Sequence, residues 1–206
     1  MKSAATLLTA ILATIIFVVA GSIGWSVGRG AGASLPGTVA VQAHTTVPTH
    51  IYLTVATPDM LKTDVGPAVL PSAVTVPANS DVTVTIMNFD NATPLTGAYV
   101  KYATAAGIEG KFTAQTMNPT NPNAAATAPA QSLAAVDPAT VSHTFTIPSL
   151  NINVPLLASS RTTFTFRSGA PGTFEWHCQD PCGTGPAGWS GAMAVQGYMG
   201  GELTVA

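Results

Sequence analysis

The stretch GTFEWHCQDPCG, residues 172–183, is the part of the sequence that most clearly indicates a fold. Its first half alternates apolar and polar residues, the period-2 pattern of a β-strand with one buried face. Phe174, Trp176 and Cys178 would therefore point to one side of a sheet, and His177 to the other. We expect the strand to end in the Cys178 thiol, and His177 to be a poor partner for any metal that Cys178 binds.

Other strand-like segments extend from His50 to the end of the chain. Pro, Gly and Asn separate them, and nothing after the first 29 residues has a convincing helical period of 3.6. The expected strands are 51–55, 82–86, 97–102, 141–147, 163–166 and 202–206. Many short strands with turn residues between them predict an all-β sandwich or barrel.

Residues 103–139 do not fit this pattern. They are dominated by Ala, Thr, Asn, Gln and Pro, and a structureless segment of this length is uncommon inside a compact domain. We expect a long insertion here, most simply a low-complexity surface loop.

The first 29 residues predict a membrane anchor or a signal segment. No charge occurs between Ser3 and Gly28, and a run of about 20 apolar residues is long enough to cross a bilayer as a helix. A cleaved signal peptide, with a small-residue site at 31–33, is the alternative. In both cases the rest of the chain lies outside the cytoplasm, and the Gly-, Thr- and Pro-rich residues 30–49 form a flexible linker.

Composition excludes several classes of protein. Only 8% of the 206 residues are charged, the formal net charge is −2, and no basic block exists to hold a nucleic acid. With 47% hydrophobic residues the chain can bury a core, so it is not a disordered protein. Four His and two Cys allow only a small metal site, and exclude a multicopper oxidase, which needs about ten imidazoles.

Three segments carry side chains that bind metals. His143 opens the expected strand 141–147, Cys178 and Cys182 are four residues apart, and Met199 precedes the last strand. Imidazole, thiolate and thioether groups together are typical copper ligands. Outside the cytoplasm the two cysteines could instead form a disulfide, and that alternative stays open.

Taken together, the turn and strand 77–90, the HTFTIP segment at 143–148, the strand that ends in Cys178 and the YMGGELTV segment at 198–205 resemble the cupredoxins. The resemblance runs from about Ile51 to the end of the chain. It implies a Greek-key β-sandwich domain over 50–206 that binds copper. The ligands implied by the family pattern are His143, Cys178, Cys182 and Met199.

The loop departs from the mononuclear pattern of that family. A second His is expected about five residues after the first Cys, and Gly183 stands there. The Cys-x3-Cys-Gly motif is similar to subunit II of haem-copper oxidases, which carries a binuclear copper centre. The second imidazole of that motif is also missing, because counting back from Met199 places Gln196 there. Met193, Gln196 and the Asp180 carbonyl stay open as further ligands.

The resemblance implies a membrane-anchored, extracytoplasmic copper protein that carries out one-electron transfer in a respiratory chain. Its partner would be a redox protein such as an oxidase or a cytochrome, docked on the loop 183–197. We do not expect an enzyme or a small-molecule substrate, because no nucleophile is paired with a base and four ligands leave no open metal position. The alternatives are Cu(I) delivery or buffering for an oxidase, and a metal-free, disulfide-stapled interaction module.

Overall fold

A computed structural model describes residues 49–206, apart from 122, 123, 125 and 127. The expected anchor at 1–29 and almost all of the expected linker at 30–49 lie outside the described residues. Among the residues that are described, no helix combines the length and apolar character needed to span a membrane.

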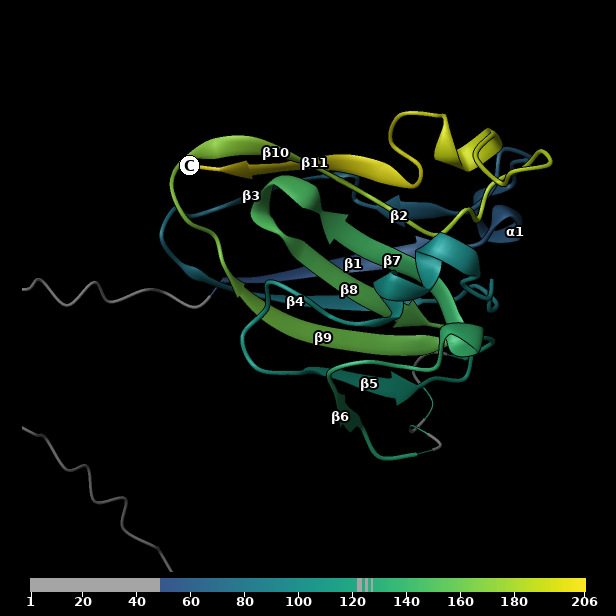
Figure 1. Cartoon of the computed structure of the whole chain (residues 1–206), viewed down its shortest axis with the longest axis horizontal. Coiled ribbons are helices and arrows are strands. Elements are labelled where there is room, and N and C mark those ends of the chain that lie inside the picture. The colour runs from purple at the N-terminus through teal and green to yellow at the C-terminus, as the bar shows by residue number, and fades with distance from the viewer. Residues whose placement is uncertain (1–48, 122–123, 125, 127) are drawn as a thin grey trace, which may run out of the picture. The chain divides into compact units, whose positions relative to one another are not determined.

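The described chain folds into two β-sheets (Figure 1). The first contains, in spatial order, β2 (Ala68–Leu70), β1 (Thr49–Ala56), β4 (Asp81–Asn88), β9 (Ser160–Arg167), β5 (Phe112–Thr116) and β6 (Gln131–Leu133). The second contains β3 (Ala73–Val76), β11 (Gly200–Val205), β10 (Gly172–His177), β7 (Val141–Ile147) and β8 (Ile152–Leu157). Neighbouring strands are antiparallel except for β1 with β4 and β3 with β11. The short helical turns are α1 (Pro58–Leu61), η1 (Gly97–Ala103), η2 (Pro138–Thr140), η3 (Pro148–Leu150) and η4 (Gly191–Met193).

The core lies between the two sheets and confirms the expected sandwich. The ring of Phe145 on β7 lies 5.9 Å from that of Phe164 on β9, and 5.4 Å from that of Trp176 on β10. All three rings are buried, and burying each one contributes roughly 1.5–3 kcal/mol. The predicted alternation of β10 is also confirmed, since Trp176 and Cys178 are buried while Glu175 is exposed.

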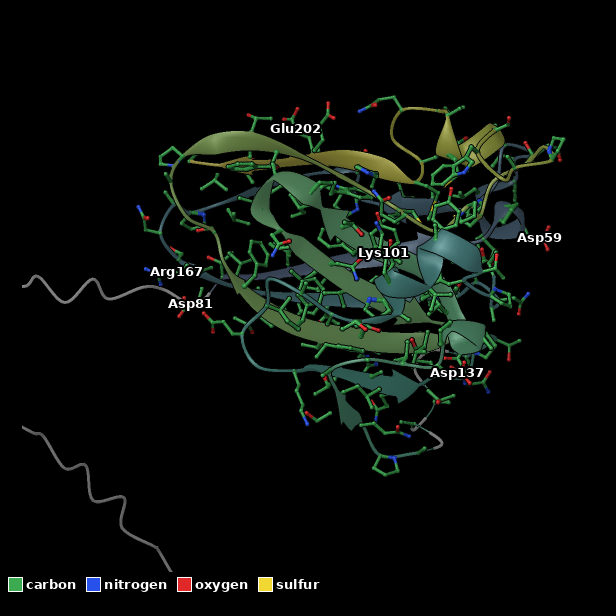
Figure 2. All side chains as sticks on the ribbon, in the orientation of Figure 1. Asp59, Asp81, Lys101, Asp137, Arg167 and Glu202 are labelled. Atoms are coloured by element: carbon green, nitrogen blue, oxygen red, sulfur yellow. The ribbon has the colours of Figure 1, made fainter. Side chains whose placement is uncertain are left out.

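Charged side chains lie around the outside of this core. Figure 2 shows the labelled Asp, Glu and Arg side chains at the outline of the sandwich, and Lys101 is exposed on the short helix η1. Asp81, at the start of β4, accepts a hydrogen bond of 2.7 Å from Arg167 at the end of β9. Both side chains are about half exposed, so this ion pair contributes little to stability.

Two expectations about secondary structure were wrong. Residues 97–102, expected as a strand, form η1, because Tyr99 and Tyr102 pack on the buried Leu95 and Val141 at a spacing of three residues. Residues 103–139 contribute strands β5 and β6, and β5 pairs with β9 inside the first sheet. The sequence signal of β5 is weak because only Phe112 and Ala114 mark its buried face.

Strand β8 was absent from the expected strands, and it contains a proline. Pro155 has no N–H to donate and is therefore confined to sheet edges and bulges. The structure places β8 at the edge of the second sheet, where this is tolerated.

Phe112→Ala tests whether the segment 103–139 is part of the core. Phe112 is fully buried, so we expect the variant to lose about 3–5 kcal/mol of the free energy of unfolding. Chemical denaturation measures this loss. Lys111→Ala is the matched control, because the neighbouring Lys111 side chain is exposed. Equal stability of the two variants would contradict a core role for β5.

Candidate metal centre

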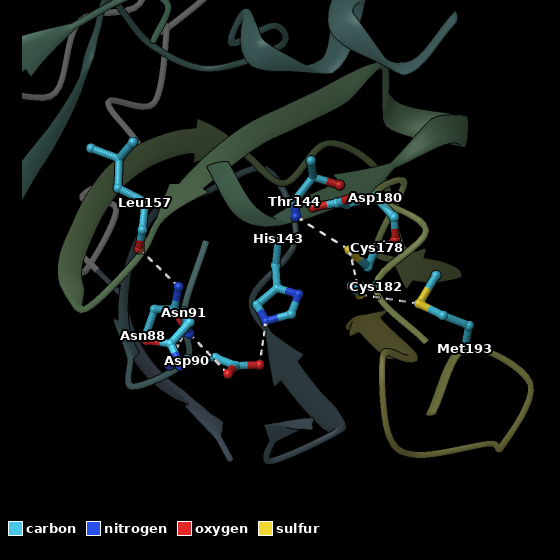
Figure 3. A network of polar contacts seen from close by, with 10 residues as sticks. All are labelled: Asn88, Asp90, Asn91, His143, Thr144, Leu157, Cys178, Asp180, Cys182 and Met193. Atoms are coloured by element: carbon cyan, nitrogen blue, oxygen red, sulfur yellow. Dashed lines mark hydrogen bonds and ion pairs between the residues drawn. The ribbon is translucent and has the colours of Figure 1, made fainter. Parts of the chain in front are cut away.

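Three metal-binding side chains meet where β10 ends and β11 begins. One ligand atom each of His143, Cys178 and Cys182 lies within 4.8 Å of the others (Figure 3). His143 belongs to β7, Cys178 directly follows β10, and Cys182 lies in the loop that leads to β11. The structure therefore brings together three of the four residues predicted as ligands. We call them the His–Cys–Cys cluster.

A β-bulge on β7 sets the direction of His143. The register against β8 shifts between Val141 and His143, and such bulges re-aim side chains. The imidazole is fully buried, and its Nε2 lies 3.1 Å from Oδ2 of Asp90. A carboxylate only accepts hydrogen bonds, so Nε2 carries the proton.

The other ring nitrogen of His143 has no partner. Nδ1 is buried and makes no hydrogen bond to any described residue, which is costly for a polar atom inside a protein. Figure 3 shows this nitrogen on the side of the ring that faces the cysteines. A metal ion bound there would use its lone pair.

The two sulfur atoms lie side by side as free thiols. Cys178 Sγ lies 3.6 Å from Cys182 Sγ. The backbone N–H of Thr144, the residue after His143, donates to Cys178 Sγ at 3.3 Å. The N–H of Cys178 donates to the carbonyl of Met199 at 2.8 Å, which fixes the base of the loop against the start of β11.

The thioether that contacts the cluster in the described structure belongs to Met193. Its Sδ lies 3.4 Å from Cys182 Sγ, and the short turn η4 positions it. Met199 is buried, and its carbonyl accepts the hydrogen bond from the N–H of Cys178. A ligand role for Met199 stays a prediction. From the sequence, Met193 was considered only as one of several possible further ligands.

Two of the other residues considered from the sequence make no contact with the cluster among the hydrogen bonds of the described residues. Gln196 is exposed. The ring of His177 contacts the side chain of Gln179 and not the cysteines, as expected from its opposite direction on β10.

The position where a second imidazole was expected has no room for a side chain. A Cβ on Gly183 would lie 2.1 Å from the Ser190 carbonyl oxygen and 2.8 Å from Cγ of Met193. The loop returns tightly over this glycine, and the same close approach places Met193 against Cys182. The departure from the family pattern thus has a steric basis.

Charges inside the cluster stabilise each other. Burial raises the pKa of the Cys178 thiol, but the hydrogen bond with Cys182, the neighbouring His143 imidazole and the Thr144 N–H together bring it well below its usual range. Burial lowers the pKa of His143, yet Asp90 and Cys178 outweigh it and raise the value to about 9. The hydrogen bond to Cys178, followed by burial, raises the pKa of Cys182. These shifts favour a proton on His143 and on Cys182 over a proton on Cys178 in the copper-free site.

Asp180 places a carboxyl group next to the His–Cys–Cys cluster. Both of its carboxyl oxygens are buried and unpartnered among the residues that the structure describes. Burial, and then the Cys178 charge, raise its pKa to about 7. Its carbonyl oxygen accepts a 2.7 Å hydrogen bond from the N–H of Cys182, and lies 3.5 Å from Cys178 Sγ.

The donor set fits copper. One imidazole nitrogen, two thiol sulfurs and a thioether are soft to intermediate ligands, which favour copper over hard cations such as Mg²⁺ or Ca²⁺. Burying Nδ1 of His143 without a hydrogen-bond partner costs free energy, and a metal bound to this atom would remove that cost.

Sequence reasoning missed Asp90 as a partner of His143. The two residues are 53 positions apart, and no motif links them. The one usable signal was a carboxylate four residues after the strongly alternating segment 82–86.

No protein-family profile and no curated protein sequence matches the chain. Solved structures do resemble it. Auracyanin A, described as a "blue" copper protein from the green thermophilic photosynthetic bacterium Chloroflexus aurantiacus, is 16% identical, with 77% of this chain and 99% of that chain covered and a TM-score of 0.35. Dithionite-reduced auracyanin from Roseiflexus castenholzii is 20% identical, with 77% and 97% covered and a TM-score of 0.34. A multicopper oxidase from Campylobacter jejuni is 9% identical, with 77% and 29% covered and a TM-score of 0.38.

These neighbours are cupredoxins, the family that the sequence resembles.

Copper binding at pH 7 should release protons from this site. Metal ligands must be deprotonated, and the raised pKa values of His143 and Cys182 keep one proton on each in the copper-free protein. Two released protons make the apparent affinity rise about a hundredfold per pH unit near neutrality, and less steeply above pH 9. Calorimetry in buffers of different ionisation enthalpy counts these protons.

The control for this titration is Asp180→Asn, which removes a neighbouring carboxyl group whose pKa is raised to about 7 and which would otherwise add to the proton count. We expect the proton release from His143 and Cys182 to persist in this variant. A binding heat that does not depend on the buffer would contradict the proposed protonation of the site.

Proposed function

We propose that this chain is a copper protein that carries single electrons between redox partners. The observation that carries the proposal is the His–Cys–Cys cluster, in which a buried imidazole presents an unpartnered nitrogen to two free sulfurs. Copper held there would supply a one-electron couple between Cu(I) and Cu(II).

The chain's own residues would keep the ligand geometry constant between these two states. His143 lies on a strand in which every residue is buried. The N–H of Cys178 donates a hydrogen bond to the carbonyl of Met199, the residue directly before the last strand. The N–H of Thr144 stabilises negative charge on Cys178 Sγ. A frame of this kind limits rearrangement when the charge of the site changes, which favours fast electron transfer.

The fourth donor in this proposal is Met193, which contacts Cys182. His143, Cys178, Cys182 and Met193 would fill the four positions that a small site offers. No position then remains for a substrate, and we propose a carrier and not an enzyme.

The loop 183–197 would be the face on which a redox partner docks. It contains no Asp, Glu, Lys or Arg, and Trp189 and Val195 are exposed on it. A face without charged side chains favours brief contacts that are not electrostatically steered. In the finer role, an anchored chain would serve an oxidase or a cytochrome of a respiratory chain outside the cytoplasm. The anchor rests on the sequence of residues 1–29, and the respiratory partner rests on the resemblance to cupredoxins and to subunit II of haem-copper oxidases.

Delivery or buffering of Cu(I) is the second candidate, and two observations favour it. Three of the four donors are sulfur atoms, which are the ligands that Cu(I) prefers. Cys182 is also partly exposed, so a partner could reach it for metal exchange. A third candidate, the metal-free module, requires Cys178 and Cys182 to be bridged, and thiol counting on the purified chain tests it directly.

Optical and EPR spectra of the copper-loaded, oxidised full chain test the proposal. We expect an intense thiolate-to-Cu(II) band that is lost in Cys178→Ser and in His143→Ala. The matched control is His177→Ala, because His177 neighbours Cys178 in sequence but contacts Gln179. Reversible voltammetry of the same sample supports a carrier. Tight Cu(I) binding without a stable Cu(II) form would overturn the carrier in favour of delivery.

Met193→Leu and Met199→Leu distinguish the two candidate thioether ligands. Leucine conserves most of the volume and removes the sulfur. We expect Met193→Leu to weaken Cu(I) binding about tenfold and to change the EPR spectrum, since one weak donor contributes ~1.4 kcal/mol. Met199→Leu should leave both unchanged. Competition titrations with a Cu(I) chelator measure the affinities, and the reverse pattern would assign the thioether to Met199.

A further inference from the structure

We propose that Asp90 is a positioning residue for the copper ligand His143, which holds the imidazole so that Nδ1, and not Nε2, is offered to the metal. This inference rests on the proposed copper site. It concerns a residue that lies outside the set of ligands and that no sequence motif indicated.

The first observation is the contact between the two side chains. Oδ2 of Asp90 lies 3.1 Å from Nε2 of His143, whose ring is otherwise enclosed by the core. With Nε2 held as the donor, the lone pair of Nδ1 is the one that can bind a metal. Nδ1 is also the buried atom that has no partner in the described chain.

The second observation is that the carboxylate is itself held in place. Its other oxygen, Oδ1, accepts a 2.9 Å hydrogen bond from the N–H of Asn91, so both oxygens are used. The N–H of Asp90 donates to Oδ1 of Asn88 at 3.0 Å, which closes a tight turn after β4 (Figure 3).

The third observation is that this turn is tied to the rest of the sandwich. Asn88 is fully buried, and its Nδ2 donates to the Leu157 carbonyl at the end of β8, at 2.8 Å. The carbonyl of Asp90 accepts a 3.1 Å hydrogen bond from the N–H of Ser159. The carboxylate therefore has a fixed position relative to β7, which is the neighbour of β8.

This arrangement has two consequences for a bound metal. A carboxylate behind a ligand imidazole fixes its tautomer and raises its basicity, and loss of such a partner typically lowers metal affinity about 10–100-fold. Its negative charge also favours Cu(II) over Cu(I), because the more positive ion is stabilised more strongly. The first effect depends on geometry, and the second on charge.

Two substitutions separate these effects. Asp90→Ala removes both the acceptor and the charge, and we expect the affinity for Cu²⁺ to fall about 10–100-fold. Asp90→Asn keeps an oxygen acceptor and removes the charge, so we expect a smaller loss of affinity and a reduction potential shifted upwards. The control is Asp81→Asn, at the opposite end of β4, where the carboxylate is half exposed and pairs with Arg167 (Figure 2).

The measurements use the full chain with Cu²⁺ alone as the probe. Competition titration gives the affinity, voltammetry gives the potential, and thermal unfolding of each copper-free variant shows whether it is folded. Proton NMR of the copper-free protein follows the Nε2–H signal of His143, which should be shifted downfield by the Asp90 bond and lost in Asp90→Ala. A merely structural role for Asp90 would leave the potential of Asp90→Asn unchanged.

The possible outcomes separate this inference from the proposed function. If the unsubstituted chain binds copper, and both Asp90 variants match it in affinity and potential, the positioning role is overturned while the copper site stands. If the unsubstituted chain binds no copper, the proposed function fails, and the positioning role fails with it. A large loss in Asp90→Ala, with an upward shift in Asp90→Asn and none in Asp81→Asn, supports the inference.

Discussion

The complete burial of the His143 imidazole is the constraint on which the site depends. A polar ring inside an apolar sandwich has to find a partner for each nitrogen. Asp90 satisfies Nε2, and nothing in the described chain satisfies Nδ1. The hydrogen bond to Asp90, and then the neighbouring Cys178, raise the pKa of the ring in the copper-free protein. Metal binding replaces the second proton of the ring, so the same burial that makes the copper-free site costly favours its occupation.

The sandwich supports this site by fixing three separate segments. Strand β7 carries His143 on a bulge, β10 leads to Cys178, and the loop before β11 brings Cys182 and Met193 inward. Beneath the cluster, Phe145 stacks on Trp176, so that the same two strands also form the centre of the core. A change in the packing of these core rings would therefore displace His143 and Cys178, which lie on or next to the same strands.

Period-2 patterning was enough to predict most of the longer strands, an all-β sandwich or barrel, and the opposite directions of Cys178 and His177, because such alternation is visible in one sequence. The resemblance to cupredoxins narrowed this to a sandwich. It could not reveal β5, whose buried face is marked by only two residues. The ligand types were predictable from their chemistry and their place next to strands. Their partners were not, since the contact of Asp90 with His143 depends on a bulge and a distant turn, and that of Met193 on the tight packing around Gly183.

The central claim is that the His–Cys–Cys cluster binds a copper ion that changes oxidation state in place. X-ray absorption at the copper edge tests it most directly, with the loaded full chain measured after oxidation and again after reduction. We expect a first shell of sulfur together with one imidazole nitrogen in both states, and Cys178→Ser should remove sulfur from it. A shell of oxygen and nitrogen alone, or a set of ligands that is exchanged on reduction, would contradict the claim.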